Sequence, residues 1–259
     1  MDTVTINRIH TLWDELADFD AASADAARTH LLTSLCALVD AQNANWLGAV
    51  RLSDIASVDP VHGWRPRKVI YLYPSPPIDA ALAEQMERIE QGSIDLSIVR
   101  NIAHAGVFRA NRLIDLVPEE WFASAYYQAY YKGLGREDAI WAGCPVNEDA
   151  EVYFGLFRHV GQPRFDEAER ETIAYALRGL KWFHRQQMLA HGLLVASMPL
   201  TPAERAVLQE LLTGRPEKEI AAGLDKSHHT IHEYVTNIYR KFGVQNRAAL
   251  MALWLGKAN

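Results

Sequence analysis

Cysteine and long apolar runs are scarce in this chain of 259 residues, which contains two cysteines, Cys36 and Cys144. Two thiols cannot build a disulfide framework or a four-thiolate zinc site, and they fit a reducing compartment. The longest stretch without Asp, Glu, Lys or Arg, residues 186–203, contains Gln, His, Ser, Thr and Pro and would make a poor membrane span. The first residues lack a basic region followed by an apolar one, so we expect no signal peptide and a cytoplasmic location.

The sequence motifs of several enzyme classes are also absent. The chain has no glycine-rich phosphate loop with a lysine, no His-Glu-x-x-His, no Gly-x-Ser-x-Gly and no Cys-x-x-Cys. We therefore expect no catalytic residue and no cofactor. His228, His229 and His232 have a spacing that metal ligands could use, but a polar helix surface accounts for them, and we expect no metal site.

Charge is distributed unevenly along the chain. The formal net charge is −6, which by itself does not suggest a nucleic-acid-binding protein. Residues 199–259, however, contain eight Lys and Arg against six Asp and Glu, whereas residues 1–198 contain 18 against 26. A weakly basic tail on an acidic body indicates two domains with different tasks.

Two kinds of hydrophobic period alternate along the first three quarters of the chain. Segments with a helical period cover residues 4–19, 25–41, 78–91 and most of 94–132. Segments with a period of two or β-branched runs, typical of strands, cover residues 46–52, 69–73, 140–146 and 152–160. Asp166 and Glu169 form a capping box that predicts a last helix running to about residue 196.

This order of elements predicts an α+β sensor domain. The stretch Asp138–Arg158, followed by Phe165–Arg170, resembles the GAF family of small-molecule-sensing domains, and a PAS-like domain remains open. We expect residues 1–196 to form this GAF/PAS-like α/β/α domain and residues 197–259 to form a second domain. The boundary falls at Ala196–Leu200, where the helical pattern stops before a proline.

The last sixty residues predict an all-α domain of four helices. Thr201 and Glu204 form a capping box with proline at the first helical position, and Gly214 ends that helix. A short helix covers residues 217–223, and Asn246 caps the last helix. The third helix begins after Ser227 and ends at Gly243, and its buried stripe consists of Ile231, Val235, Ile238 and Phe242.

The opposite face of this third helix is polar, which suits the major groove of double-stranded DNA. A short helix, a tight turn and such a helix predict a helix-turn-helix. The segment resembles the LuxR-type DNA-binding domain, on Leu200–Leu208, Gly214, Lys218–Ala221, Leu224, Ser227, Thr230-Ile231, Asn237–Val244 and Asn246–Leu250. The resemblance implies a transcriptional regulator whose DNA contacts come from Lys218, Ser227, Thr230, His232, Glu233, Thr236, Asn237, Arg240, Lys241 and Arg247. Glu233 departs from the family pattern, and it would either accept a hydrogen bond from cytosine or repel phosphate.

Aromatic residues crowd into the stretch 121–141 and give two alternatives. They line a pocket for a small-molecule ligand, or they form an aromatic core with a dimer surface. The first alternative predicts a ligand site formed by Trp121, Tyr126, Tyr130, Trp141 and Cys144. Cys144 could instead be a redox sensor, but inert packing in a half-buried strand is the simpler interpretation.

The signal that such a regulator would sense remains open. We do not expect a phosphorylated receiver, since neither an early acidic pair nor a parallel-sheet pattern is visible in the sequence. Trp121, Tyr126, Tyr130 and Asp138 loosely match acyl-homoserine-lactone receptors of quorum sensing, but no Asp-Pro follows the tyrosines. A sensor for another small molecule or for a protein partner, or a ligand-independent solo regulator, completes the alternatives.

We also expect a homodimer, because one helix-turn-helix reads only a few base pairs. Two apolar stripes could pair with a second copy in a symmetric interface. The long helix 166–196 supplies Ile173, Leu177, Leu180 and His184, and the last helix supplies Leu250, Leu253 and Trp254.

Overall fold

The structure, a computed structural model, describes residues 1–52, 59–194 and 200–255 and divides into two compact units. Unit 1 comprises residues 1–16 and 29–181, and unit 2 comprises residues 17–28 and 182–259. The first unit is mixed α/β and the second is helical, so the expected combination of an α/β domain with C-terminal helices is confirmed. The predicted boundary between residues 196 and 197 lies outside the described residues.

A five-stranded antiparallel sheet forms the middle of unit 1, with the strand order β2-β1-β5-β4-β3. Its central pair runs from Asn43 opposite Phe157 to Val50 opposite Ala150. The strands are β1 (Asn43–Arg51), β2 (Trp64–Tyr71), β3 (Arg109–Arg112), β4 (Arg136–Asn147) and β5 (Ala150–His159). Strand β5 is buried along almost its whole length and β1 along most of it, because helices cover both faces of the sheet.

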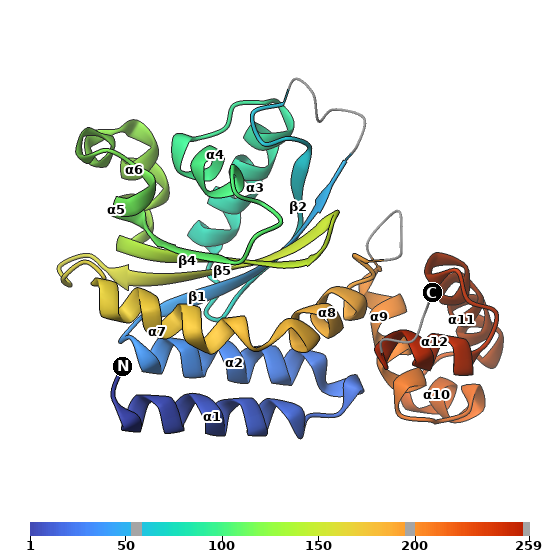
Figure 1. Ribbon diagram of the computed structural model, residues 1–259. Coiled ribbons are helices and arrows are strands. Elements are labelled where there is room, and N and C mark those ends of the chain that lie inside the picture. Colours follow the sequence, from blue (N-terminus) through green and yellow to red (C-terminus); the bar gives the residue numbers. More distant parts are fainter. Residues whose placement is uncertain (53–58, 195–199, 256–259) are drawn as a thin grey trace. The chain divides into compact units, whose positions relative to one another are not determined.

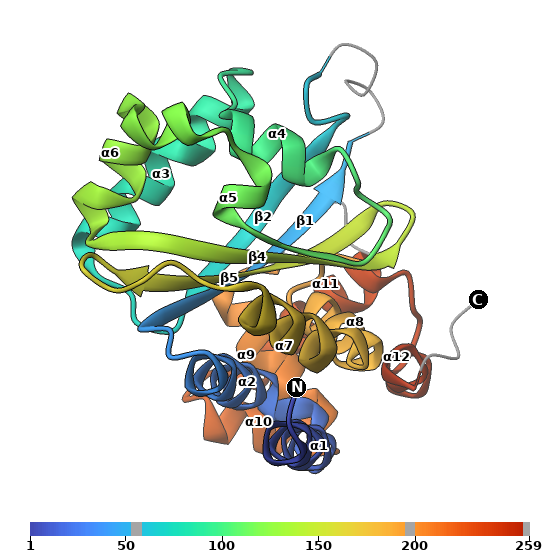
Figure 2. The ribbon, with the colours of Figure 1, turned by 60° about the vertical axis from the view of Figure 1, so that its left-hand side comes forward.

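The helices of unit 1 form two layers around this sheet (Figures 1 and 2). One face is covered by α3 (Pro76–Glu90), α4 (Leu96–Ile102), α5 (Leu113–Leu116) and α6 (Ala125–Tyr130). The other face is covered by α7 (Glu167–Arg178) and α2 (Ala24–Leu38), with α1 (Thr3–Ala17) outermost. The short 3₁₀ helices of unit 1 are η3 (Glu119–Ala123) and η4 (Lys132–Leu134), whereas η1 (Ala21–Ser23) belongs to unit 2.

Unit 2 contains the four C-terminal helices that the sequence predicts. They are α9 (Pro202–Leu212), α10 (Glu217–Gly223), α11 (His228–Phe242) and α12 (Arg247–Trp254). Helix α8 (Lys181–Ala190) contributes Leu189 to the same apolar core, against which Ala21 and Ala22 also pack. The core of this unit therefore includes residues that precede the helix-turn-helix in sequence.

The stretch 94–132 is mostly helical, as predicted, but it also contains β3, which was not predicted and pairs with β4 from Arg109 opposite Gly143 onward. One prediction of secondary structure was wrong. The long helix after Asp166 breaks into α7 and α8. In a continuous helix the Ala176 carbonyl would accept from Leu180, but here it accepts from the Trp13 indole at 2.8 Å, and the Leu180 amide donates to Leu177 instead.

Both stripes that were expected to mediate dimerisation are buried within the chain. Ile173, Leu177, Leu180 and His184 are at most 2% exposed, and Leu250, Leu253 and Trp254 at most 8%. The Trp254 ring packs against Phe242 at 5.8 Å between centroids. These side chains already fill the cores of their own units, so neither stripe is a free surface for a second copy.

Within the described part of the chain, none of the helices combines the length and the apolar character that crossing a membrane requires.

Candidate functional site

Helix α11 carries the predicted polar surface, and both of its ends are closed by local contacts. The Ser227 hydroxyl accepts from the Thr230 amide at 3.0 Å and lies 2.9 Å from the Thr230 hydroxyl. At the other end Gly243 adopts φ 64°, a left-handed conformation that glycine reaches without strain. Its buried face consists, as predicted, of Ile231, Val235, Ile238 and Phe242. The opposite face is therefore rigidly presented to solvent.

That solvent-facing surface is polar, and its side chains make few hydrogen bonds or ion pairs with one another. His232 contacts Glu217 at 3.0 Å, and Arg240 donates to the Asn237 amide oxygen at 2.8 Å. Glu233 lies 3.4 Å from His229, with both side chains more than 60% exposed. The exposed members of the predicted DNA-contacting set are Lys218, Ser227, His232, Glu233, Thr236 and Arg240, and the half-exposed members are Thr230 and Asn237.

The remaining two predicted DNA contacts, Lys241 and Arg247, are engaged inside unit 2. The Lys241 ammonium lies 2.7 Å from Glu204, whose carboxylate also caps α9. Burial alone would raise the pKa of Glu204, but Lys241 and Thr201 outweigh it and lower that pKa below its ordinary value. Arg247 donates to the Arg215 carbonyl at 2.7 Å and to the carbonyl of Leu211 at the end of α9. Both cations hold the unit together.

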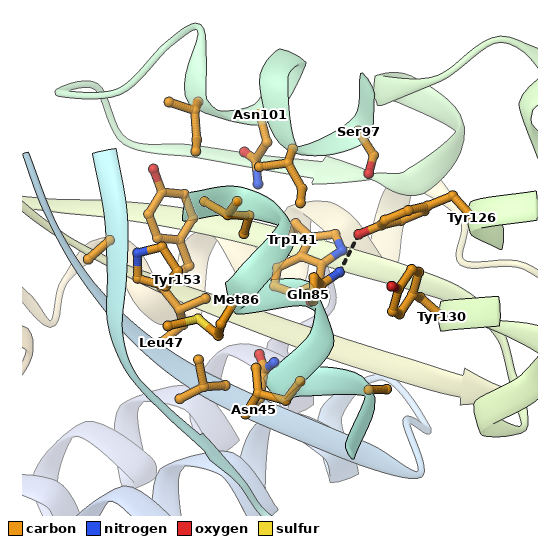
Figure 3. A pocket seen from close by; sticks show the side chains of 18 of the residues that line it. Asn45, Leu47, Gln85, Met86, Ser97, Asn101, Tyr126, Tyr130, Trp141 and Tyr153 are labelled. Atoms are coloured by element: carbon orange, nitrogen blue, oxygen red, sulfur yellow. Dashed lines mark hydrogen bonds between the residues drawn. The ribbon is translucent and has the colours of Figure 1, made fainter. Parts of the chain in front are cut away.

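A pocket lies in unit 1 between the sheet and the helices α3, α4 and α6 (Figure 3). Tyr126, Tyr130 and Trp141 of the predicted ligand site line it. Trp121 does not: its indole donates to Asp95 at 3.1 Å, and its ring belongs to the neighbouring aromatic core. Cys144 is also outside the lining and is 2% exposed in β4. The aromatic stretch therefore serves both a pocket wall and a core.

Several polar lining residues come from segments that the sequence analysis did not select. Gln85 of α3 donates to the hydroxyl of Tyr126 from α6, and Figure 3 shows this hydrogen bond joining the two side chains. Burial raises the pKa of Tyr126 well above its ordinary value, so the phenol stays protonated. The other polar groups of the lining that were missed are Asn45, Arg65, Ser97, Asn101, Tyr131, Arg136 and Tyr153.

A buried ion pair fixes one end of this lining. Arg109 donates to both oxygens of Glu151, at 2.9 and 3.0 Å, and to the Tyr153 hydroxyl at 2.9 Å. It also donates to the Asn101 carbonyl at 2.7 Å, which ties α4 to the sheet. Gly143 makes room for this side chain, since a Cβ there would lie 2.6 Å from the guanidinium carbon. The pair thereby positions Asn101 and Tyr153, two of the lining residues.

The family described as "Bacterial regulatory proteins, luxR family" matches residues 198–254, which span the four helices of the helix-turn-helix segment. The C-terminal domain belongs to the luxR family. The "Probable HTH-type transcriptional regulator GfsR" of Streptomyces halstedii is 35% identical to the chain over 60 residues. That match covers 23% of this chain and only 25% of GfsR, so it concerns the luxR-family domain alone. This domain is a regulatory one rather than an enzyme domain.

One solved structure shows a similar fold over the length of the chain. "SdiA in complex with octanoyl-rac-glycerol" has a TM-score of 0.51 and 14% identity, and the match covers 100% of this chain and 97% of that one. A crystal structure of Escherichia coli SdiA has a TM-score of 0.48 and 14% identity, with 97% of each chain covered. The first likeness supports the fold assignment beyond the luxR-family domain.

Within unit 2, segments that precede the luxR-family domain hold it by polar contacts. Asp25 pairs with Arg205 of α9 at 2.7 Å and with Arg28 at 2.8 Å. Arg205 also donates to the Ala190 carbonyl at 3.2 Å. Arg185 of α8 donates to the Leu253 carbonyl of α12 at 2.9 Å. Residues 17–28 and 182–190 therefore contact two helices of the luxR-family domain directly.

Proposed function

We propose that this protein is a sequence-specific DNA-binding transcriptional regulator whose N-terminal domain senses a small molecule. The observation that carries the DNA-binding part is the exposed polar face of α11 on a luxR-family domain. Such a face offers donors and acceptors to base edges, while nearby cations contact phosphates. The structure favours Lys218 and Arg240 for the phosphates and His232, Glu233 and Thr236 for the bases.

Fluorescence anisotropy with duplex DNA from the promoter of the protein's own gene tests this proposal. The full chain should bind with an affinity that falls as salt rises, since phosphate contacts release counterions. Lys218→Ala and Arg240→Ala should each weaken binding to all sequences and reduce the salt slope by about one. Lys68→Ala, which removes an exposed lysine from unit 1, is the control and should change neither quantity. Salt-independent binding would contradict the proposal.

The base contacts form a separate part of the proposal. Glu233→Gln keeps a hydrogen-bonding side chain but removes the negative charge. If the carboxylate accepts from cytosine, the variant should lose about 1–3 kcal/mol of discrimination at one base pair. If it repels phosphate instead, the variant should bind every sequence more tightly. Competition binding with single-base operator variants separates the two outcomes.

For the sensing part, we propose that residues 1–196 form a GAF-like domain whose pocket binds an amphipathic small molecule. The pocket combines an apolar wall with polar side chains that can orient a ligand, as small-molecule sites do. SdiA, whose structure shares this fold, is described in complex with octanoyl-rac-glycerol. Native mass spectrometry of protein purified from its own host should detect a bound molecule as added mass. A ligand-independent regulator would be favoured by two results together: no added mass in native mass spectrometry, and no change in melting temperature on addition of octanoyl-rac-glycerol.

The acyl-homoserine-lactone alternative has less support from the pocket. Of the four residues that suggested it, Tyr126 and Tyr130 line the cavity, whereas Trp121 and Asp138 are not among the lining residues. Asp138 is buried and accepts from the Phe165 amide at 2.8 Å. An acyl-homoserine lactone that raised the melting temperature of the full chain would restore this alternative.

We further propose that the regulator acts as a homodimer on paired half-sites, because a single small domain reads few base pairs. The interface must lie outside the two buried stripes. Light scattering of the full chain at tens of micromolar should give about twice 29.1 kDa. A monomeric mass both with and without DNA would contradict the dimer.

A further inference from the structure

One buried arginine in the pocket of unit 1 lacks an acidic partner. Arg136, the first residue of β4, lines the pocket and is 6% exposed. Its Nη2 atom is enclosed and has no hydrogen-bond acceptor among the residues that the structure describes. The guanidinium lies against two ring faces, 4.0 Å from the centroid of Phe157 and 5.1 Å from that of Tyr71. These rings offer the cation a cation–π contact but no oxygen.

The other buried arginines of the described chain each have a carboxylate partner. Within the same pocket lining, Arg65 pairs with Asp59 at 2.8 Å. Arg109 pairs with Glu151 at 2.9 Å, Arg158 with Glu169, and Arg28 with Asp25 at 2.8 Å. A buried charge without a partner is strongly unfavourable, so a site that retains one is prepared for a counter-charge from elsewhere.

We infer that the ligand of this pocket carries a carboxylate that pairs with Arg136, with an apolar tail along the wall formed by Leu47, Val69, Ile78 and Met86. This inference rests on the proposed sensing function and specifies its ligand class. The planar guanidinium presents two parallel N–H groups that match a carboxylate. Because Arg65 is already neutralised by Asp59, the lining offers one uncompensated positive charge, which a monoanion balances and a phosphate dianion exceeds.

Decanoate and its neutral methyl ester are probes that differ mainly in charge. Binding to the full chain is measured at pH 7.5 by tryptophan fluorescence, since Trp64 and Trp141 line the pocket. We expect decanoate to bind about 10- to 100-fold more tightly than methyl decanoate, the range for a hydrogen-bonded charge. Arg136→Met should abolish this preference and leave the affinity for the ester unchanged. Arg136→Lys keeps the positive charge but loses the two parallel N–H groups of the guanidinium. Its preference for decanoate over the ester should lie between those of the parent and of Arg136→Met.

Two controls separate ligand recognition from a structural role. Lys68→Met removes an exposed cation of the same unit that lies outside the pocket lining, and it should keep the preference for the acid. The ligand-free melting temperature of Arg136→Met should equal or exceed that of the parent, because the variant removes an unpaired buried charge. A large fall in this melting temperature would mean that Arg136 serves the fold, and would overturn the inference.

The remaining outcomes are also decisive. If both probes bind the parent equally, or if Arg136→Met keeps the preference, the carboxylate assignment is wrong while the sensing proposal stands. If neither probe binds, the carboxylate inference fails for fatty acids. The added mass in native mass spectrometry then decides separately whether the sensing proposal fails with it.

Discussion

The surface of α11 and the pocket of unit 1 are built in opposite ways. The surface comes from one continuous segment, residues 227–243. Its polar groups are exposed, and apart from His232, which contacts Glu217, their contacts are with near neighbours in the sequence. The pocket combines residues from Asn45 to Tyr153, supplied by strands and helices that are far apart in the chain. Its charges are buried, so each requires a partner, whereas water can solvate the charges on α11. The α11 surface is therefore determined by one segment of the sequence, whereas the pocket is determined by how the fold brings distant segments together.

The largest expected effect concerns the buried pair that supports the pocket. Glu151→Gln removes the partner of Arg109 while the guanidinium stays buried, so the free energy of unfolding should fall by about 3–5 kcal/mol. Asp149→Asn, in an exposed pair with Arg51, is the matched control and should cost less than about 1 kcal/mol. Urea unfolding of the full chain measures both. Equal losses would show that burial does not distinguish the two pairs.

The next effect tests whether Arg247 belongs to the fold or to the DNA surface. Arg247→Ala removes the donor to the Arg215 carbonyl and one of the two donors to the Leu211 carbonyl at the end of α9, and it should cost about 2 kcal/mol of stability. Arg240→Ala removes an exposed side chain and should change stability by less than about 0.5 kcal/mol. The effects of the two variants on DNA binding should be the reverse of their effects on stability. Arg240→Ala should reduce the salt dependence of DNA affinity, and Arg247→Ala should leave it unchanged. Unfolding curves and salt titrations on the same two variants provide the comparison, and a reduced slope for Arg247→Ala would restore it as a phosphate contact.

Local signals in the sequence were enough to predict the luxR-family domain. The capping box of Thr201 and Glu204, the stripe of α11 and the left-handed Gly243 are patterns within a few residues of one another, and the structure contains all three. What they could not predict is the pairing of Lys241 with Glu204, 37 positions away. A basic residue on a helix surface has the same local pattern whether it faces DNA or an acidic neighbour.

The pocket was only partly predictable for a related reason. The aromatic stretch indicated Tyr126, Tyr130 and Trp141, but the lack of a partner at Arg136 is a property of everything packed around it. The break between α7 and α8 is similar, since Trp13 competes for a helix carbonyl from more than 160 residues away. Such features follow from tertiary contacts, which periodicity and capping patterns do not contain.

A smaller effect concerns the acid stability of the Glu204–Lys241 pair. The pKa of Glu204 lies below its ordinary value of 4.5 in the folded chain, because the pull of Lys241 and Thr201 exceeds the effect of burial. The ionised carboxylate therefore stabilises the fold above about pH 4.5, and this contribution is lost as the pH falls through the lowered pKa. Glu204→Gln should reduce the free energy of unfolding at pH 7 by about 1 kcal/mol. Below pH 4.5, the stability of the variant should fall less steeply with pH than that of the parent. Thermal unfolding from pH 3 to pH 7 measures it, and an unchanged acid-side slope in the variant would contradict the assignment.

The smallest expected effect concerns the two cysteines. Oxidising conditions should change neither the pocket region nor DNA binding. Cys36 and Cys144 are 8% and 2% exposed. Burial raises the pKa of the Cys36 thiol to about 12, and burial together with the nearby Glu151 raises the pKa of Cys144 still further. A thiol reacts as its thiolate, so both should stay inert near neutral pH. A thiol reagent at pH 8 should label neither cysteine in the folded chain and both in denaturant, and hydrogen peroxide should leave DNA affinity unchanged. Rapid labelling of Cys144 in the folded chain, with a peroxide-induced change in DNA affinity that Cys144→Ala removes, would instead establish the redox sensor that inert packing argues against.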